Sequence, residues 1–173
     1  NDEDYGDMLT YSLDEEISNI NFDFEDRHVI LSYVDDEQLT IEYFEHENDT
    51  FTFSAINETL IIEQSYKRLA FSLFSFNFVS REVKTVNVKI PHTWILDDVN
   101  IQTKTGDIMM DFDNKVTYQS LYVSNLTGKI IIENVDVFSF DAYATTGDMR
   151  LKDIKVEDDT KIEISTGDID IDA

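Results

Sequence analysis

The chain has 173 residues, the length of one domain, and 42% hydrophobic residues supply enough apolar surface for a folded core. Thirteen Lys and Arg residues stand against 37 Asp and Glu residues, and the net charge of −24 argues against binding to a nucleic-acid backbone or an anionic membrane. The absence of cysteine excludes disulfides, thiolate zinc sites and a cysteine nucleophile.

No apolar run approaches the ~18 residues that a membrane span requires. The first four residues, Asn-Asp-Glu-Asp, lack the basic and apolar parts of a signal peptide. We therefore expect either a cytosolic protein or a mature or trimmed chain.

The N-terminal half predicts short strands. Residues 1–16 carry seven acids and no base, which is typical of a solvated arm or a loosely docked edge. Apolar and polar residues then alternate over 20–24, 39–43, 51–55 and 86–90, and no segment has a helical pattern. We predict an irregular strand region over 17–91, which ends at the only proline, Pro91.

Residues 69–79 contain four phenylalanines and change phase between Leu73 and Phe74, which predicts a bulge or tight reversal. The run is either an exposed surface for a partner or, as is more common for such runs, part of the core.

The second half, 92–173, predicts regular repeats. Four of the five glycines lie in nearly the same tetrapeptide, and they are separated by 22, 19 and 20 residues. The tetrapeptides are Thr105-Gly106-Asp107-Ile108, Thr127-Gly128-Lys129-Ile130, Thr146-Gly147-Asp148-Met149 and Thr166-Gly167-Asp168-Ile169.

Apolar residues recur five places before each glycine and two and four places after it. They are Ile101, Val123, Ala142 and Ile162; Ile108, Ile130, Met149 and Ile169; and Met110, Ile132, Leu151 and Ile171. This spacing indicates strand, glycine turn and strand in every repeat. Because one such unit cannot bury its own apolar face, we predict an all-β, single-domain parallel β-solenoid over 17–173 with coils of ~20 residues.

Stacked coils would align Asp107, Lys129, Asp148 and Asp168 in one column. Only Asp148 and Asp168 are then like-charged neighbours, and a cation between them is one interpretation. We favour the structural interpretation, since Asp commonly caps turns through its own side chain.

The strand Val86-Asn-Val-Lys-Ile-Pro91 and the following Thr-Gly-Asp-Ile repeats resemble the bacterial family of putative adhesins, a domain of unknown function called DUF4097. The resemblance covers about residues 17–173. It implies a β-solenoid in a cell-surface or cell-envelope protein, and a binding or scaffold role without catalytic residues. Lys129 departs from the family pattern, which has Asp there, and it would interrupt any metal ladder.

Motifs for catalysis are absent from the sequence: there is no Gly-x-Ser-x-Gly, phosphate-binding glycine loop or His-Glu-x-x-His. The histidines, His28, His46 and His92, belong to no recognisable constellation. Close acidic pairs are expected by chance in so acidic a chain; they are Asp35 with Asp36, Asp97 with Asp98, and Asp158 with Asp159. We therefore assign no catalytic, cofactor-binding or metal-ligating residue and no cofactor.

We expect a non-enzymatic surface or envelope module, held by a tether outside this chain, whose partner is a protein or a cell-wall carbohydrate. The alternatives are a carbohydrate-active enzyme on a β-helix scaffold and an intracellular regulatory or assembly protein. Weak divalent-cation binding and edge-to-edge pairing of two copies also stay open as expectations.

Overall fold

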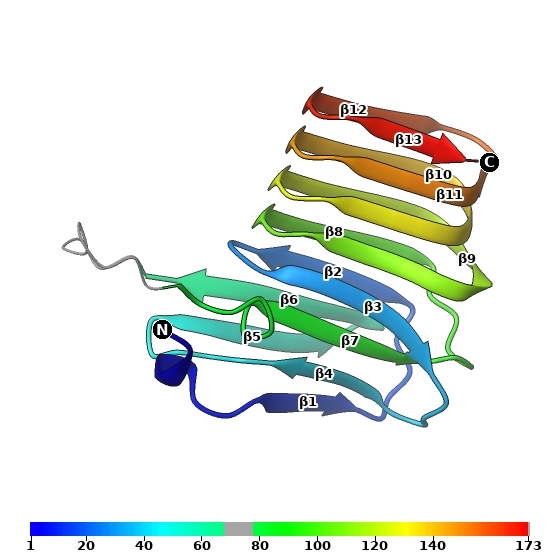
Figure 1. Ribbon diagram of the computed structural model, residues 1–173. Coiled ribbons are helices and arrows are strands. Elements are labelled where there is room, and N and C mark those ends of the chain that lie inside the picture. Colours follow the sequence, from blue (N-terminus) through cyan, green and yellow to red (C-terminus); the bar gives the residue numbers. More distant parts are fainter. Residues whose placement is uncertain (68–77, 173) are drawn as a thin grey trace.

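The structure is a computed structural model that describes residues 1–67 and 78–172, and almost every element is a strand (Figure 1). The elements are the 3-10 helix η1 (Asp2–Tyr5) and the strands β1 (Leu9–Leu13), β2 (Asn19–Phe24), β3 (His28–Val34), β4 (Leu39–Tyr43), β5 (Asp49–Ile56), β6 (Thr59–Tyr66), β7 (Thr85–Pro91), β8 (Asp98–Thr105), β9 (Ile108–Thr127), β10 (Ile130–Thr146), β11 (Met149–Val156), β12 (Thr160–Thr166) and β13 (Ile169–Asp172). None of the described helices is both long and apolar enough to span a bilayer.

The strands stack as two walls that enclose one core (Figure 1). The front wall is β1, β4, β7, β3, the first parts of β9 and β10, β11 and β13. The back wall is β5, β6, β2, β8, the last parts of β9 and β10, and β12. Because β9 and β10 run through a corner from one wall to the other, the walls form one continuous sheet.

Equivalent residues of successive repeats pair in register, as predicted. Ile108 pairs with Ile130, Ile130 with Met149, and Met149 with Ile169. The first three are at most 1% exposed, whereas Ile169, on the outermost rung, is 39% exposed. Inward of the outermost rung, the apolar files that the sequence predicts therefore form the core of the C-terminal half.

The glycine turns bring neighbouring coils too close for any side chain. Gly147 has a φ of 139°, and a Cβ built on it would lie 1.9 Å from the carbonyl oxygen of Gly128. A Cβ on Gly128 would lie 2.1 Å from the carbonyl oxygen of Gly106. Glycine is needed here both for its positive φ and for this close approach.

The all-β prediction is confirmed, but the sheet is mixed. The strands from β8 to β13 pair in parallel, whereas β4 is antiparallel to β1 and β7, and β5 is antiparallel to β6. β1, which lies within residues 1–16, pairs along its whole length with β4. The bulge or tight reversal predicted for the phenylalanine-rich run 69–79 falls largely on residues 68–77, which lie outside the described residues.

Candidate functional site

One corner of the strand stack contains an insertion. In β10 the corner is a single residue, Asn134, with a φ of 63°, between Glu133 and Val135. In the neighbouring β9, Glu133 pairs with Asp111 and Val135 with Val116, so residues 112–115 lie opposite Asn134 alone. The surplus of three residues accounts for the glycine spacing of 22 in this coil against 19 in the next.

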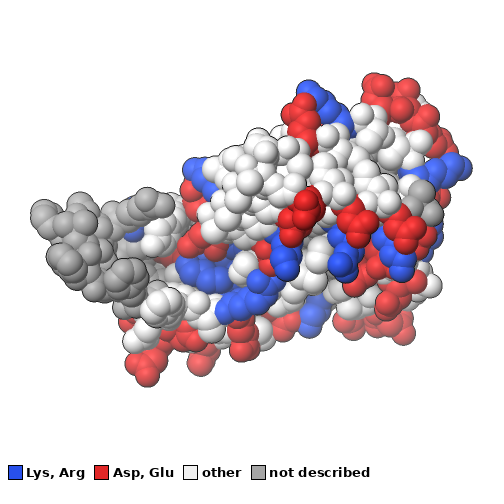
Figure 2. All heavy atoms as spheres, turned by 45° about the horizontal axis from the view of Figure 1, so that its top comes forward, with Lys and Arg blue, Asp and Glu red and all other residues white. Residues whose placement is uncertain are grey.

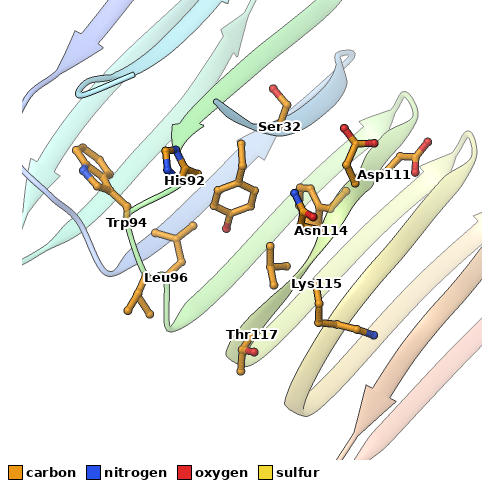
Figure 3. A pocket seen from close by; sticks show the side chains of 13 residues that line it. Ser32, His92, Trp94, Leu96, Asp111, Asn114, Lys115 and Thr117 are labelled. Carbon is orange, nitrogen blue, oxygen red and sulfur yellow. The ribbon is translucent and has the colours of Figure 1, made fainter. Parts of the chain in front are cut away.

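The inserted corner forms a pocket of about 530 Å³, which we call the corner pocket. Its residues are Ser32 and Tyr33 of β3, His92, Trp94, Ile95 and Leu96 of the segment before β8, and Asp111, Phe112, Asp113, Asn114, Lys115, Val116 and Thr117 of β9. Figure 3 shows His92, Trp94 and Leu96 across the hollow from Asn114 and Lys115. Insertions into repeats are often the binding parts of repeat proteins, and this one builds a cavity.

The apolar side of the corner pocket is aromatic and fixed. The rings of Tyr33 and Phe112 meet edge to face with centroids 5.1 Å apart, and Trp94 is 7% exposed. The Tyr33 hydroxyl is 2.8 Å from that of Tyr118. Burial raises the pKa of Tyr33 to about 12, so this wall is uncharged at neutral pH.

The polar side of the corner pocket combines anchored and accessible groups. The Lys115 ammonium group is bound outside the pocket: its Nζ donates to the Asp153 carbonyl oxygen at 2.8 Å and lies 3.2 Å from the Asp136 carboxylate. The exposed side chains of Asp111 and Asp113 have no hydrogen bond or ion pair within residues 1–67 and 78–172. Two carboxylates are therefore available to accept hydrogen bonds from a ligand.

The structure separates the three histidines. His92 lines the corner pocket, where its Nδ1 is 3.1 Å from the Val34 carbonyl oxygen. His28 lies in the turn column, where its Nδ1 accepts the Asp107 backbone N–H at 2.9 Å. His46 belongs to the turn before β5, where its backbone pairs with Asp49.

The acidic pairs are also dispersed. Asp35 lies 3.7 Å from His92, whereas the Asp98 carboxylate accepts the Ser120 hydroxyl at 2.7 Å. Asp158 and Asp159 donate or accept backbone hydrogen bonds in the turn before β12. None of the three pairs contributes a carboxylate to the corner pocket.

The acidic turn column uses its side chains to hold neighbouring coils together. The Asp107 carboxylate accepts the backbone N–H of Lys129 at 2.8 Å, and the Asp148 carboxylate accepts that of Asp168 at 3.0 Å. Within the described part of the chain, no three His, Asp or Glu side chains are grouped to hold a metal ion. The geometry supports the structural interpretation of this column.

A buried charged cluster that the sequence analysis missed lies beneath the turn column. Arg27 is fully buried and donates to Asp26 and Asp49, each at 2.8 Å, and Lys84 lies 2.8 Å from Asp26. Gln64 donates to Asp26 at 2.7 Å and to Asp49 at 2.6 Å. We call these five residues the Arg27 cluster.

The Arg27 cluster stabilises the join between the two walls. Burial alone would raise the pKa of Asp49, but Arg27, Tyr5 and Gln64 outweigh it and hold the pKa below its ordinary value. The Tyr5 hydroxyl donates to Asp49 at 2.7 Å, which ties η1 to β5. The Arg27 Nε has no hydrogen-bond partner among the described residues, but the other charged groups are bonded to one another, and the cluster is a structural element.

Comparisons with known proteins add a family. Among the solved structures, a "putative cell adhesion protein" from Clostridium sporogenes has a TM-score of 0.64 at 13% identity, over 96% of this chain and 98% of that one. A "putative adhesin" from Bacteroides fragilis has a TM-score of 0.37 at 10% identity, over 97% and 98%. A "putative adhesin" from Parabacteroides distasonis has a TM-score of 0.38 at 11% identity, over 95% of this chain and 82% of that one. Only the first, with its TM-score of 0.64, supports a shared fold.

No curated protein matches the chain. The family model named Toastrack DUF4097 matches residues 17–173, the range over which the sequence shows the resemblance. The chain therefore belongs to the Toastrack DUF4097 family.

Proposed function

We propose that the chain is a non-enzymatic binding module of a bacterial cell surface or cell envelope, and that it takes its ligand in the corner pocket. The observation that carries the proposal is the three-residue insertion of β9, which departs from the spacing of the repeats and builds a cavity. The solved structure with the TM-score of 0.64 bears a name that refers to cell adhesion, which supports a surface role.

The chemistry of the corner pocket favours a carbohydrate. A sugar ring has apolar C–H faces that pack on aromatic side chains and hydroxyls that donate to carboxylates. Tyr33, Trp94 and Phe112 supply the aromatic side, and Asp111 and Asp113 supply the acceptors. The rings of Trp94 and Phe112 are held in place by burial, which lowers the entropic cost of binding.

We propose binding without catalysis because of how the acids are placed. Hydrolysis of a glycosidic bond needs two carboxyl groups on opposite sides of the bond. Asp111 and Asp113 come from the same strand, β9, and the described lining includes no carboxylate from another element. A stacked-coil scaffold would then serve to hold the corner pocket away from a tether outside this chain.

Trp94 allows a direct test because it is the only tryptophan of the chain and lines the corner pocket. Titration of the protein with cell-wall and host oligosaccharides should change its tryptophan fluorescence with a saturating curve. Asp113→Asn should weaken binding roughly 10- to 150-fold, because a hydrogen bond to a charged group contributes about 1.5–3 kcal/mol. Asp23→Asn, an exposed acid of β2 on the back wall, is the matched control.

A second variant removes the pocket itself. Replacing residues 112–115 by one Asn would give β9 the one-residue corner that Asn134 gives β10. This variant should remain folded by circular dichroism and lose binding. Wild-type affinity in this variant, or no saccharide that perturbs Trp94, would refute the proposal, and release of shortened saccharides would show an enzyme instead.

A further inference from the structure

The two ends of the strand stack differ. At the β1 end, Tyr11 of the front wall stacks on Phe53 of the back wall with ring centroids 4.4 Å apart, and these rings close the space between the walls. At the opposite end, β12 and β13 pair only with β10 and β11 among the strands described. We call residues 160–172 the open end.

Apolar side chains are uncovered at the open end. Ile169 and Ile171 of β13 are 39% and 59% exposed, whereas Met149 and Leu151, their partners one rung inward, are at most 2% exposed. Figure 2 turns this end toward the viewer and shows a largely uncharged area bordered by both acidic and basic groups. An edge strand with an uncovered apolar face can accept an added strand.

The charges of β13 indicate which strand would fit. Asp170 pairs with Arg150 and Asp172 pairs with Lys152, so basic residues of β11 lie directly opposite the acids of β13. Among the described strands, β13 pairs only with β11, so no strand lies along its other edge. A matching strand would therefore have Lys or Arg at the outward positions and apolar residues at the inward ones.

We propose that the open end binds an extended segment of a partner protein in which apolar residues alternate with Lys or Arg, added as a strand along β13. A second copy of this chain is disfavoured, because it would bring a net charge of −24 toward the same charge. The surface is separate from the corner pocket, so the proposal stands independently of the saccharide site.

Fluorescently labelled peptides of strand length are the probe. A peptide alternating Ile and Lys should bind with a saturating rise in anisotropy, and NMR shifts should concentrate on residues 168–172. A peptide alternating Ile and Glu should bind more weakly, by roughly 3- to 10-fold if two or three exposed ion pairs are exchanged for repulsions. Added salt should narrow this difference.

The charge-reversed double variant Asp170→Lys with Asp172→Lys should prefer the Ile–Glu peptide. The matched control is Asp23→Lys with Glu63→Lys, two exposed acids that pair across β2 and β6 on the back wall, and it should keep the wild-type preference. Equal binding of both peptides, an equal effect of the control, or no binding of either peptide would overturn the proposal. Self-association in sedimentation that Asp170→Lys with Asp172→Lys changes would overturn it in favour of a second copy.

Discussion

Gly147→Ala tests the turn column most directly. The added Cβ would lie 1.9 Å from the Gly128 carbonyl oxygen, whereas ordinary van der Waals contact begins at 3.4 Å. The neighbouring coils must therefore separate, which strains two turn hydrogen bonds: Gly128 N–H to the Thr146 carbonyl at 3.1 Å, and Gly147 N–H to the Thr166 carbonyl at 3.0 Å. The φ of 139° adds strain of its own.

These contributions set the expected size of the effect. Backbone strain of about 1–3 kcal/mol and two hydrogen bonds at about 0.5–1.5 kcal/mol each give a loss of about 2–6 kcal/mol. For a chain of this length the melting temperature should fall by about 4–24 °C. The melting temperature of Gly147→Val should fall at least as far, because a β-branched residue tolerates a positive φ poorly.

Gly6→Ala is the matched control for this experiment. Gly6 also has a positive φ, 67°, but a Cβ there meets no atom within 4 Å. The Gly6→Ala substitution should therefore cost only the backbone strain, about 1–3 kcal/mol, without the loss of turn hydrogen bonds. Calorimetry that finds the two alanine variants equally stable, or Gly147→Ala within about a degree of wild type, would refute the close-approach argument.

Three further predictions concern Asp49, Tyr33 and Tyr11. Asp49→Ala should destabilise the protein by about 3–5 kcal/mol in urea unfolding, because it leaves Arg27 buried without its partner. Since the folded pKa of Asp49 is lowered, its contribution is present at neutral pH and is lost as the pH falls below ~4, so wild type and variant should converge in acid. Tyr33 ionises near pH 10 when unfolded but at about 12 when folded, so stability should fall as the pH rises through this window, and less steeply in Tyr33→Phe. Tyr11→Ala should remove the stacking of Tyr11 on Phe53 and lower the free energy of unfolding by at least about 0.5–1.5 kcal/mol. A free energy of unfolding equal to that of the wild type in urea would contradict this prediction.

The repeats could be predicted from the sequence because each glycine turn repeats its local signals. Period-two alternation and the positions of Gly106, Gly128 and Gly147 are enough to set the register that the structure has. The turn at Arg27 and His28 belongs to the same column, yet it could not be recognised, since it has no glycine.

The Arg27 cluster and the corner pocket depend on contacts between distant segments. Arg27 and Asp49 are 22 residues apart, and no local pattern distinguishes Asp49 from the other acids of so acidic a chain. The corner pocket does have a signal in the sequence, because the first glycine spacing is the longest of the three. That spacing could have identified 107–127 as the coil with an insertion, although not the residues that face it from β3 and the segment before β8.

The stacking direction of the strands has a mechanical consequence. β1 lies at one end of the stack and β13 at the other, so tension between the two ends acts along the hydrogen bonds that join successive strands (Figure 1). Such a load peels one coil at a time instead of shearing many bonds together. Each coil of 19 to 22 residues could release up to about 60–80 Å of extended chain, so the chain would lengthen in steps.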